Sequence, residues 1–216
     1  MATDMSLEAQ EALASVKRAS LVKKMNEESW SDHMEFLLKS WGEKAAGLRF
    51  IHNASAGKWK KFSNQLTLTG IAISSISSAV SLVAASIDDD EIKNSVLYAV
   101  GGVGLVASLI QSIKKFYNSE EKAAEHAAIA KQFGSFYRFM TLQLGMSRAD
   151  RQPADQLSEF VLKEYERLQQ DSPPVGAGEI ALYKKVFKGA NQAVPDICED
   201  SFEIQVYTST TVEDLD

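Results

Sequence analysis

The chain contains two long stretches without a charged side chain, Phe62–Ile87 (FSNQLTLTGIAISSISSAVSLVAASI) and Asn94–Ile113 (NSVLYAVGGVGLVASLIQSI). Only the acidic segment Asp88–Lys93 (DDDEIK) separates them. A helix needs about 20 mostly apolar residues to cross the hydrocarbon core of a bilayer, and both stretches have that length. The sequence therefore predicts two transmembrane helices, at about residues 66–87 and 96–113, joined as a hairpin.

Charges on either side of these stretches predict how the hairpin is oriented. Lysines precede the first stretch and follow the second, whereas the connecting segment carries four carboxylates and one lysine. Short segments that flank transmembrane helices carry an excess of lysine and arginine on the cytoplasmic side. We therefore expect both termini in the cytoplasm and the acidic loop of residues 88–93 on the opposite side. A buried helix pair in a soluble bundle is the alternative, because small residues also suit close packing there.

The rest of the chain also favours helices. From Met34 to Ile51, apolar residues recur at three- and four-residue steps, the spacing of one helix face, and Ser31 or Asp32 can cap that helix. The segment from Lys114 to Gly145 contains no proline, which predicts one unbroken helix that continues from the second transmembrane helix. The expected fold class is all-α, an integral membrane helical hairpin with long amphipathic cytoplasmic helices.

Three regions follow from this pattern. Residues 1–29 form an N-terminal helical or flexible segment, residues 30–188 hold the two-transmembrane helical domain, and residues 189–216 form an acidic, flexible tail. The N-terminal segment and the tail are the regions expected to dock a protein partner. Cys198 is the single cysteine and is expected to be a free thiol. The formal net charge of −6 disfavours nucleic acid as a partner.

Small residues recur at three- and four-residue steps within both apolar stretches. They are Thr67, Gly70, Ser74, Ser77 and Ser81 in the first stretch and Gly101, Gly104 and Ser108 in the second. Small residues let helices in a bilayer approach closely, which favours packing within the hairpin or between subunits of a homo-oligomer. The alternative is that the hydroxyl face lines an aqueous pore, which requires several copies because two helices cannot enclose water.

The sequence contains no convincing catalytic or ligand-binding motif. Gly102, Gly104 and Ala107 match the dinucleotide fingerprint G-x-G-x-x-A, but that motif needs a strand before its helix, so we attribute these residues to helix packing. The histidines lack metal-ligand spacing. Arg49, His52, Glu125 and His126 are expected to form a polar cluster that holds the cytoplasmic helices together. We therefore expect no enzymatic activity, no cofactor and no metal.

Residues 30–188 resemble the SLATT family, the SMODS- and SLOG-associating two-transmembrane effector proteins. The resemblance rests on Trp30-Ser31-Asp32-His33, Trp41, Gly101-Gly102-Val103-Gly104, Glu125-His126, Phe136-Tyr137-Arg138 and Glu164-Tyr165-Glu166-Arg167-Leu168, in this order around the hairpin. It implies a membrane effector that forms a pore or ion channel, and the composition is similar to versions from large DNA viruses. The alternative is a structural or scaffolding protein, for example of a viral internal membrane, that recruits partners through its cytoplasmic helices and tail.

Overall fold

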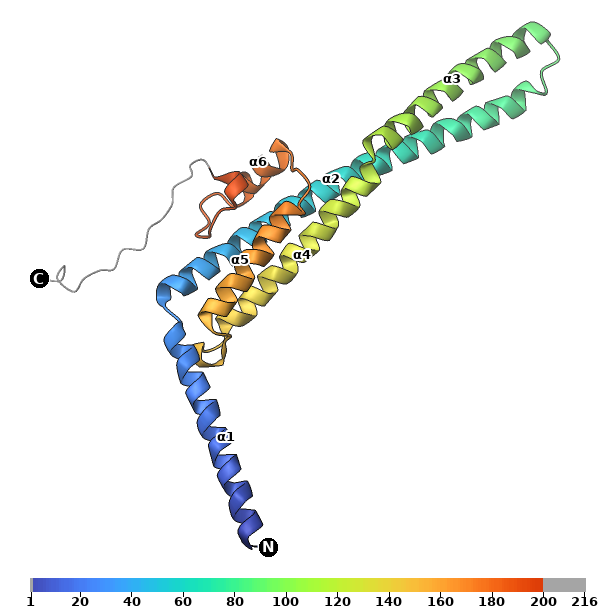
Figure 1. Cartoon of the computed structure of the whole chain (residues 1–216). Coiled ribbons are helices and arrows are strands. Elements are labelled where there is room, and N and C mark those ends of the chain that lie inside the picture. The colour runs from blue at the N-terminus through green and yellow to red at the C-terminus, as the bar shows by residue number, and fades with distance from the viewer. Residues whose placement is uncertain (1, 200–216) are drawn as a thin grey trace, which may run out of the picture. The chain divides into compact units, whose positions relative to one another are not determined.

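The computed structural model describes residues 2–199, with side chains from residue 9 onward. All regular structure in this range is helical (Figure 1), which confirms the predicted all-α class. The elements are α1 (Ala2–Ser29), α2 (Asp32–Ala84), α3 (Asp90–Tyr117), α4 (Ser119–Gly145), η1 (Arg148–Asp150), α5 (Ala154–Gln170), α6 (Ala177–Val186) and η2 (Asp196–Cys198). The two η elements are single turns of 3-10 helix.

The described chain divides into two compact units. The first comprises residues 2–51, 129–172 and 177–199, and the second comprises residues 52–128 and 173–176. Helix α2 begins in the first unit and ends in the second, and it continues through Gly57 without a break. Its start is capped by Ser31, whose Oγ accepts a hydrogen bond from the Met34 amide at 3.2 Å.

The first unit has an aromatic and aliphatic core between α5 and the parts of α2 and α4 that belong to this unit (Figure 1). The buried residues of α5 recur every three or four positions, so they form one apolar face that packs against the core. The rings of Trp41 and Tyr165 stack inside this core, with centroids 6.5 Å apart. The principal buried side chains are Leu38, Ala45, Leu48, Phe133, Phe136, Met140, Leu157, Val161 and Leu168.

Glu35, Arg148 and Arg151 form a charged cluster at the end of this core where α2 begins. Arg148 donates to both carboxylate oxygens of Glu35, each at 2.9 Å, and Arg151 donates to the same carboxylate. These guanidinium groups, with Arg148 first, lower the pKa of Glu35 to about 2. Arg151 also donates to the carbonyl oxygens of Met146 and Leu144 and lies 4.8 Å from the centre of the Trp30 ring. One buried arginine therefore connects the start of α2 to the turn that follows α4.

Residues 189–199 belong to the region expected to be a tail, and the structure gives them defined contacts. Pro195 and Cys198 are buried, and burial raises the pKa of the Cys198 thiol. Lys44 pairs with Asp196 at 2.5 Å and with Glu199 at 3.2 Å. This ordered turn therefore packs on α2. Residues 200–216, the remainder of the expected acidic tail, lie outside the described residues.

Gly47 is required where this turn meets α2. A Cβ atom at position 47 would overlap the ring of Pro195 and lie 3.1 Å from Cε2 of Tyr183. We expect Gly47→Ala to destabilise the protein by about 1 to 3 kcal/mol, because a buried proline ring cannot yield cheaply. Gly57→Ala, in the same helix, is the control: its Cβ would meet nothing within 4 Å, so we expect about 0.5 to 1 kcal/mol of stabilisation. Denaturant unfolding of both variants measures this, and equal effects would contradict the assignment.

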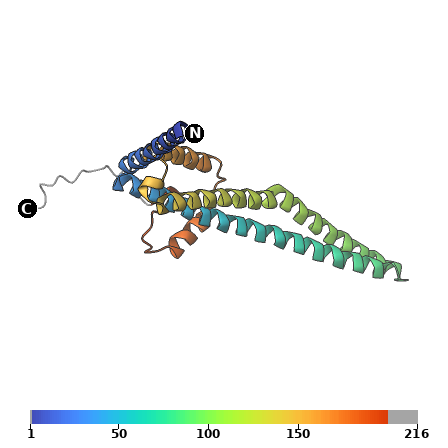
Figure 2. The ribbon, with the colours of Figure 1, turned by 90° about the horizontal axis from the view of Figure 1, so that it is seen from below.

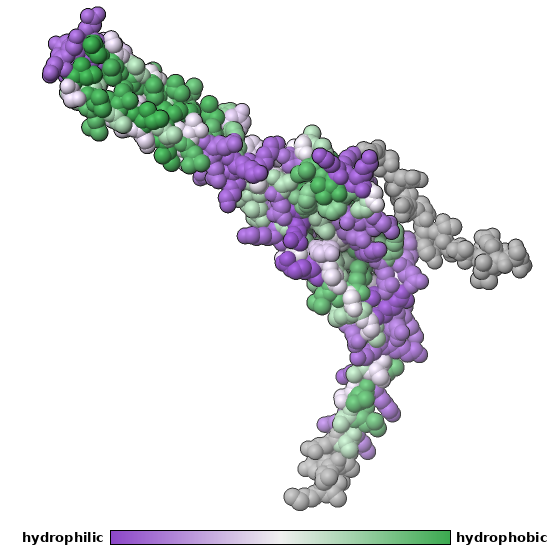
Figure 3. Space-filling model, turned by 180° about the vertical axis from the view of Figure 1, so that it is seen from behind, coloured by the Kyte–Doolittle hydropathy of each residue, from purple (hydrophilic) through white to green (hydrophobic). Residues whose placement is uncertain are grey.

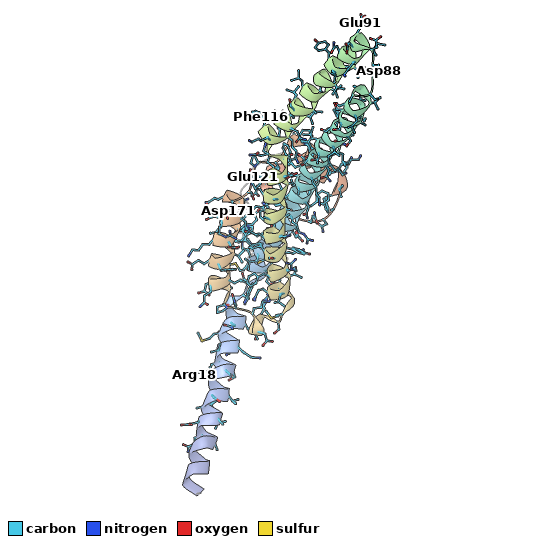
Figure 4. The ribbon with its side chains drawn as sticks, turned by 90° about the vertical axis from the view of Figure 1, so that its right-hand side faces the viewer. Arg18, Asp88, Glu91, Phe116, Glu121 and Asp171 are labelled. Atoms are coloured by element: carbon cyan, nitrogen blue, oxygen red, sulfur yellow. The ribbon has the colours of Figure 1, made fainter. Side chains whose placement is uncertain are left out.

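The second unit is dominated by a hairpin of two antiparallel helices, the last part of α2 and the whole of α3 (Figure 2). Asp89 caps α3, because its carboxylate accepts hydrogen bonds from the amides of Glu91 and Ile92 at 2.9 and 3.1 Å. Asp88 and Glu91 lie at the closed end of the hairpin (Figure 4). Acidic residues therefore occupy the first turn of α3 and lysines its last turn, an order that complements the helix dipole.

The expectation of one unbroken helix from Lys114 to Gly145 is wrong. Asn118 has φ 45° and ψ 42°, in the left-handed region, and it separates α3 from α4. Its amide donates to the Lys115 carbonyl, and its own carbonyl accepts from Lys122 at 3.0 Å, which starts the new helix. Asparagine adopts this conformation more readily than other residues with a side chain.

Candidate functional site

Two helices of the chain are long and apolar enough to cross a membrane. They are α2 and the run Asp90–Gly145, which α3 and α4 form together. In the most apolar part of α2 only 6% of the residues are buried inside the structure, and in that of the second run 0% are. Figure 3 shows the result: the hairpin has a hydrophobic surface that ends in a hydrophilic tip. Protein atoms therefore leave this apolar surface uncovered.

The predicted small-residue face of the first stretch lies partly against α3. Gly70 is buried, and a Cβ there would lie 2.8 Å from Nε2 of Gln111. Ser77 donates to the Val100 carbonyl at 3.5 Å. Thr67 and Ser81 are also half-buried, whereas Ser74 is exposed. Four of the five predicted residues are thus buried or half-buried.

The predicted small-residue face of α3 points elsewhere. Gly101, Gly104 and Ser108 are exposed, and a Cβ on either glycine would meet nothing within 4 Å. Within the predicted second stretch, residues 96–113, the half-buried residues are instead Val96, Val100, Ala107 and Ile110. The two helices of one hairpin therefore leave the small-residue face of α3 open.

Hydroxyl groups in the hairpin are largely satisfied within their own helices. Thr67 donates to the Ser63 carbonyl, Ser81 to the Ser77 carbonyl and Ser108 to the Leu105 carbonyl, each at 2.9 Å. Ser78, Ser95 and Ser112 do the same one turn back. A hydroxyl bonded in this way needs neither water nor a partner helix. These side chains can therefore face an apolar medium without an unpaired donor.

Aromatic rings gather at the open end of the hairpin. Phe62 makes edge contacts with Trp59 and Tyr117, with centroids 6.1 and 5.8 Å apart. The Lys122 ammonium lies 4.6 Å from the centre of the Trp59 ring, a cation–π contact that the sequence pattern did not indicate. Phe116 is 83% exposed. Tyr98 is exposed near the other end of α3.

A polar triad lies beside these rings. Glu120, at the start of α4, pairs with Lys114 of α3 at 2.8 Å and accepts a hydrogen bond from the buried Ser63 of α2 at 3.1 Å. Both contacts, Lys114 first, lower the pKa of Glu120. The triad joins three helices, and sequence analysis missed it because Ser63 and Glu120 are 57 residues apart.

The structure brings together only two of the four residues of the expected polar cluster. His52 of α2 and His126 of α4 are buried, with their Nδ1 atoms 2.9 Å apart. Such a contact requires one ring nitrogen to donate and the other to accept. Glu125 is exposed, and Arg49 lies in the first unit, 3.3 Å from the position that a Cβ on Gly134 would occupy. Direct contact between members of the expected cluster is thus shown for His52 and His126.

The histidine pair predicts that the folding stability of the second unit falls at acidic pH. Burial first, and His126 second, lower the pKa of His52 from 6.5 to about 4. Between these values the unfolded chain binds the proton and the folded chain does not, so stability is full above pH 6.5 and falls as the pH drops toward 4. We expect a loss on the order of 2 kcal/mol across this window. Thermal unfolding followed from pH 7.5 to 4 measures it.

Two variants make this measurement specific: one replaces both histidines of the pair, and the other, the control, replaces a histidine outside it. The double variant His52→Leu and His126→Leu should flatten the pH dependence, because it removes both titrating rings of the pair. His33→Gln, in the exposed first turn of α2, should leave it unchanged. A slope that persists in the double variant would show that other groups cause it.

Between residues 2 and 199, no three His, Cys, Asp or Glu side chains lie where they could together hold a metal ion. No family model matches the chain, and no match was found among curated proteins or solved structures.

Proposed function

We propose that this chain is a non-enzymatic integral membrane protein whose hairpin spans a bilayer and assembles several copies into a membrane effector that forms a pore. One observation supports the proposal above all: the apolar parts of two long helices are left uncovered by protein. Large exposed patches of this kind mark membrane or protein contacts. Lipid covers both faces of a hairpin, whereas a single protein partner covers one.

The charges and rings at the ends of the hairpin support the same placement. Lysines and aromatic side chains gather at the open end, where the headgroup region of a bilayer would be. The carboxylates at the closed end would lie in water on the far side. In this arrangement the first unit and both termini are cytoplasmic.

Assembly of several copies is supported by the open face of α3. Gly101 and Gly104 leave space at their Cβ positions and lie next to the exposed Ser108. Close approach of two such faces in lipid is favourable, because small residues bring the helix backbones into contact. We propose that this face of one copy packs against another copy, and that the exposed Ser74 and its neighbours line the space between copies.

Substitution on this face tests the assembly. Gly104→Ile and Gly101→Ile should convert the oligomer to a monomer, because a branched side chain prevents close backbone contact. Gly102→Ile is the control, since Gly102 is equally open in the hairpin but one residue removed from the small-residue face. Mass measurement of the detergent-solubilised full chain, with cross-linking in membranes, reads out the result. A wild-type monomer would contradict the proposal.

A scaffolding role is the second candidate, and the hydroxyl geometry favours it. Thr67, Ser81 and Ser108 bond to carbonyls of their own helices and need no water. Neither transmembrane stretch contains Asp, Glu, Lys, Arg or His to select an ion. Reconstituted oligomer that conducts ions would support the effector, as the resemblance to SLATT proteins implies. An oligomer that never conducts would support the scaffold.

A further inference from the structure

A pocket of about 590 Å³ lies where α3 ends and α4 begins. Phe116 and Glu121 mark this part of the chain in Figure 4. The residues that matter for its chemistry are Lys114, Lys115, Asn118, Ser119, Glu120 and Glu121. All belong to the second unit, at the end of the hairpin that carries the aromatic rings.

Backbone groups give one side of this pocket an affinity for anions. The left-handed Asn118 ends α3, so α4 starts anew at Ser119. The first amides of a helix have no acceptor within that helix, and they carry the positive end of its dipole. A helix that begins inside a pocket therefore presents donors suited to a phosphate oxygen.

Ser119 adds a second, independent indication of a ligand. Its side chain is 1% exposed and lines the pocket, and its Oγ has no hydrogen-bond partner in the described chain. A buried hydroxyl without a partner costs stability, and native proteins rarely leave one so. A ligand oxygen in the pocket would supply the missing partner.

The charges of the pocket select a ligand that carries both signs. Lys114 and Glu120 neutralise each other at 2.8 Å, whereas neither Lys115 nor Glu121 forms an ion pair with another described residue. A simple anion would meet the carboxylate of Glu121, and a simple cation would meet Lys115 and the positive end of α4. A zwitterion satisfies both.

We propose that this pocket binds the headgroup of a phospholipid with a primary ammonium, of the phosphatidylethanolamine class. The phosphate accepts from Lys115, the first amides of α4 and the Ser119 hydroxyl, and the ammonium donates to Glu121. A quaternary choline fits less well, because it prefers aromatic faces and Lys122 already occupies those of Trp59 and Tyr117 at 4.6 and 6.0 Å. The inference rests on the proposed membrane function.

Native mass spectrometry of the detergent-solubilised full chain tests this, with dioleoyl phosphatidylethanolamine, phosphatidylcholine, phosphatidylglycerol or inorganic phosphate added. We expect the ethanolamine lipid to be retained at about tenfold lower concentration than the other lipids. Lys115→Ala, Glu121→Gln and Ser119→Ala should each remove most of this preference. Lys61→Ala is the matched control, since Lys61 is an exposed lysine beside the first stretch but outside the pocket, and it should retain the preference.

Each opposite result overturns the assignment. Preference for phosphatidylglycerol that strengthens in Glu121→Gln would show a simple anion site, and displacement of lipid by inorganic phosphate would show a site for soluble phosphate. Equal losses in Lys61→Ala and Lys115→Ala would show that lipid is attracted by surface charge in general rather than by the pocket.

Flotation with vesicles of mixed phosphatidylethanolamine and phosphatidylglycerol separates the two proposals. A chain that floats but shows no lipid preference refutes only the pocket, whereas a chain that stays in solution refutes the membrane function.

Discussion

Replacing Arg151 with alanine is expected to destabilise the first unit by about 2 to 3 kcal/mol, a substantial part of the stability of an ordinary domain. The side chain is 9% exposed and bonds to Glu35 and to two backbone carbonyls. Its removal leaves Glu35 with Arg148 as its remaining arginine partner and takes the donor from the carbonyls of Met146 and Leu144. Denaturant unfolding of the full chain in detergent measures the loss.

Two further variants make this result specific. Arg167→Ala removes an arginine that pairs with Glu164 and Asp171 on the exposed side of α5, and it should cost less than about 1 kcal/mol. Arg151→Lys should not restore stability, because an ammonium cannot make the same set of planar contacts or stack on Trp30. Full stability of Arg151→Lys would show that charge alone matters at this position.

The second large effect is expected from Leu105→Arg. Leu105 is 73% exposed on α3, near the middle of the predicted second transmembrane stretch. An arginine at the centre of a transmembrane helix costs about 2.5 to 3.5 kcal/mol in insertion, which is a shift of roughly a hundredfold. We therefore expect the membrane-inserted fraction of the chain, measured by alkaline extraction of expressing cells, to fall sharply.

The control for this prediction is an equally apolar residue outside the hairpin. Leu13 is 57% exposed on α1, so Leu13→Arg should leave the inserted fraction unchanged. Equal extraction of wild-type and Leu105→Arg chains would contradict insertion of α3. Wild-type protein that dissolves and stays compact without detergent would contradict membrane insertion altogether.

The helices of this chain could be predicted because their signals are local. The uncharged stretches and the apolar spacing after Ser31 each act within a few turns. The break at Asn118 also had a local signal, since Asn118 with Glu121 three residues later is a start pattern for a helix. The absence of proline outweighed it in the prediction, although a left-handed asparagine ends a helix as well.

Contacts between distant segments could not be predicted in the same way. The pair of His52 and His126 joins positions 74 residues apart, and its geometry depends on how α2 and α4 align. The outward direction of Gly101 and Gly104 has the same cause, because the packing face of α3 is set by its register against α2 rather than by residue size. Glycine spacing alone indicates close packing somewhere, but it does not identify the partner.

The capped acidic turn at the end of the hairpin has a consequence for biogenesis. The carboxylate of Asp89 accepts hydrogen bonds from two backbone amides at the start of α3, and three more carboxylates are adjacent to it in the sequence. In a bilayer this group must be carried through hydrocarbon once, when the hairpin enters, and a charged side chain there is costly. Spontaneous entry would be slow, so a translocation machine would be needed. The same barrier would act in reverse, so a hairpin that had entered a bilayer would leave it slowly.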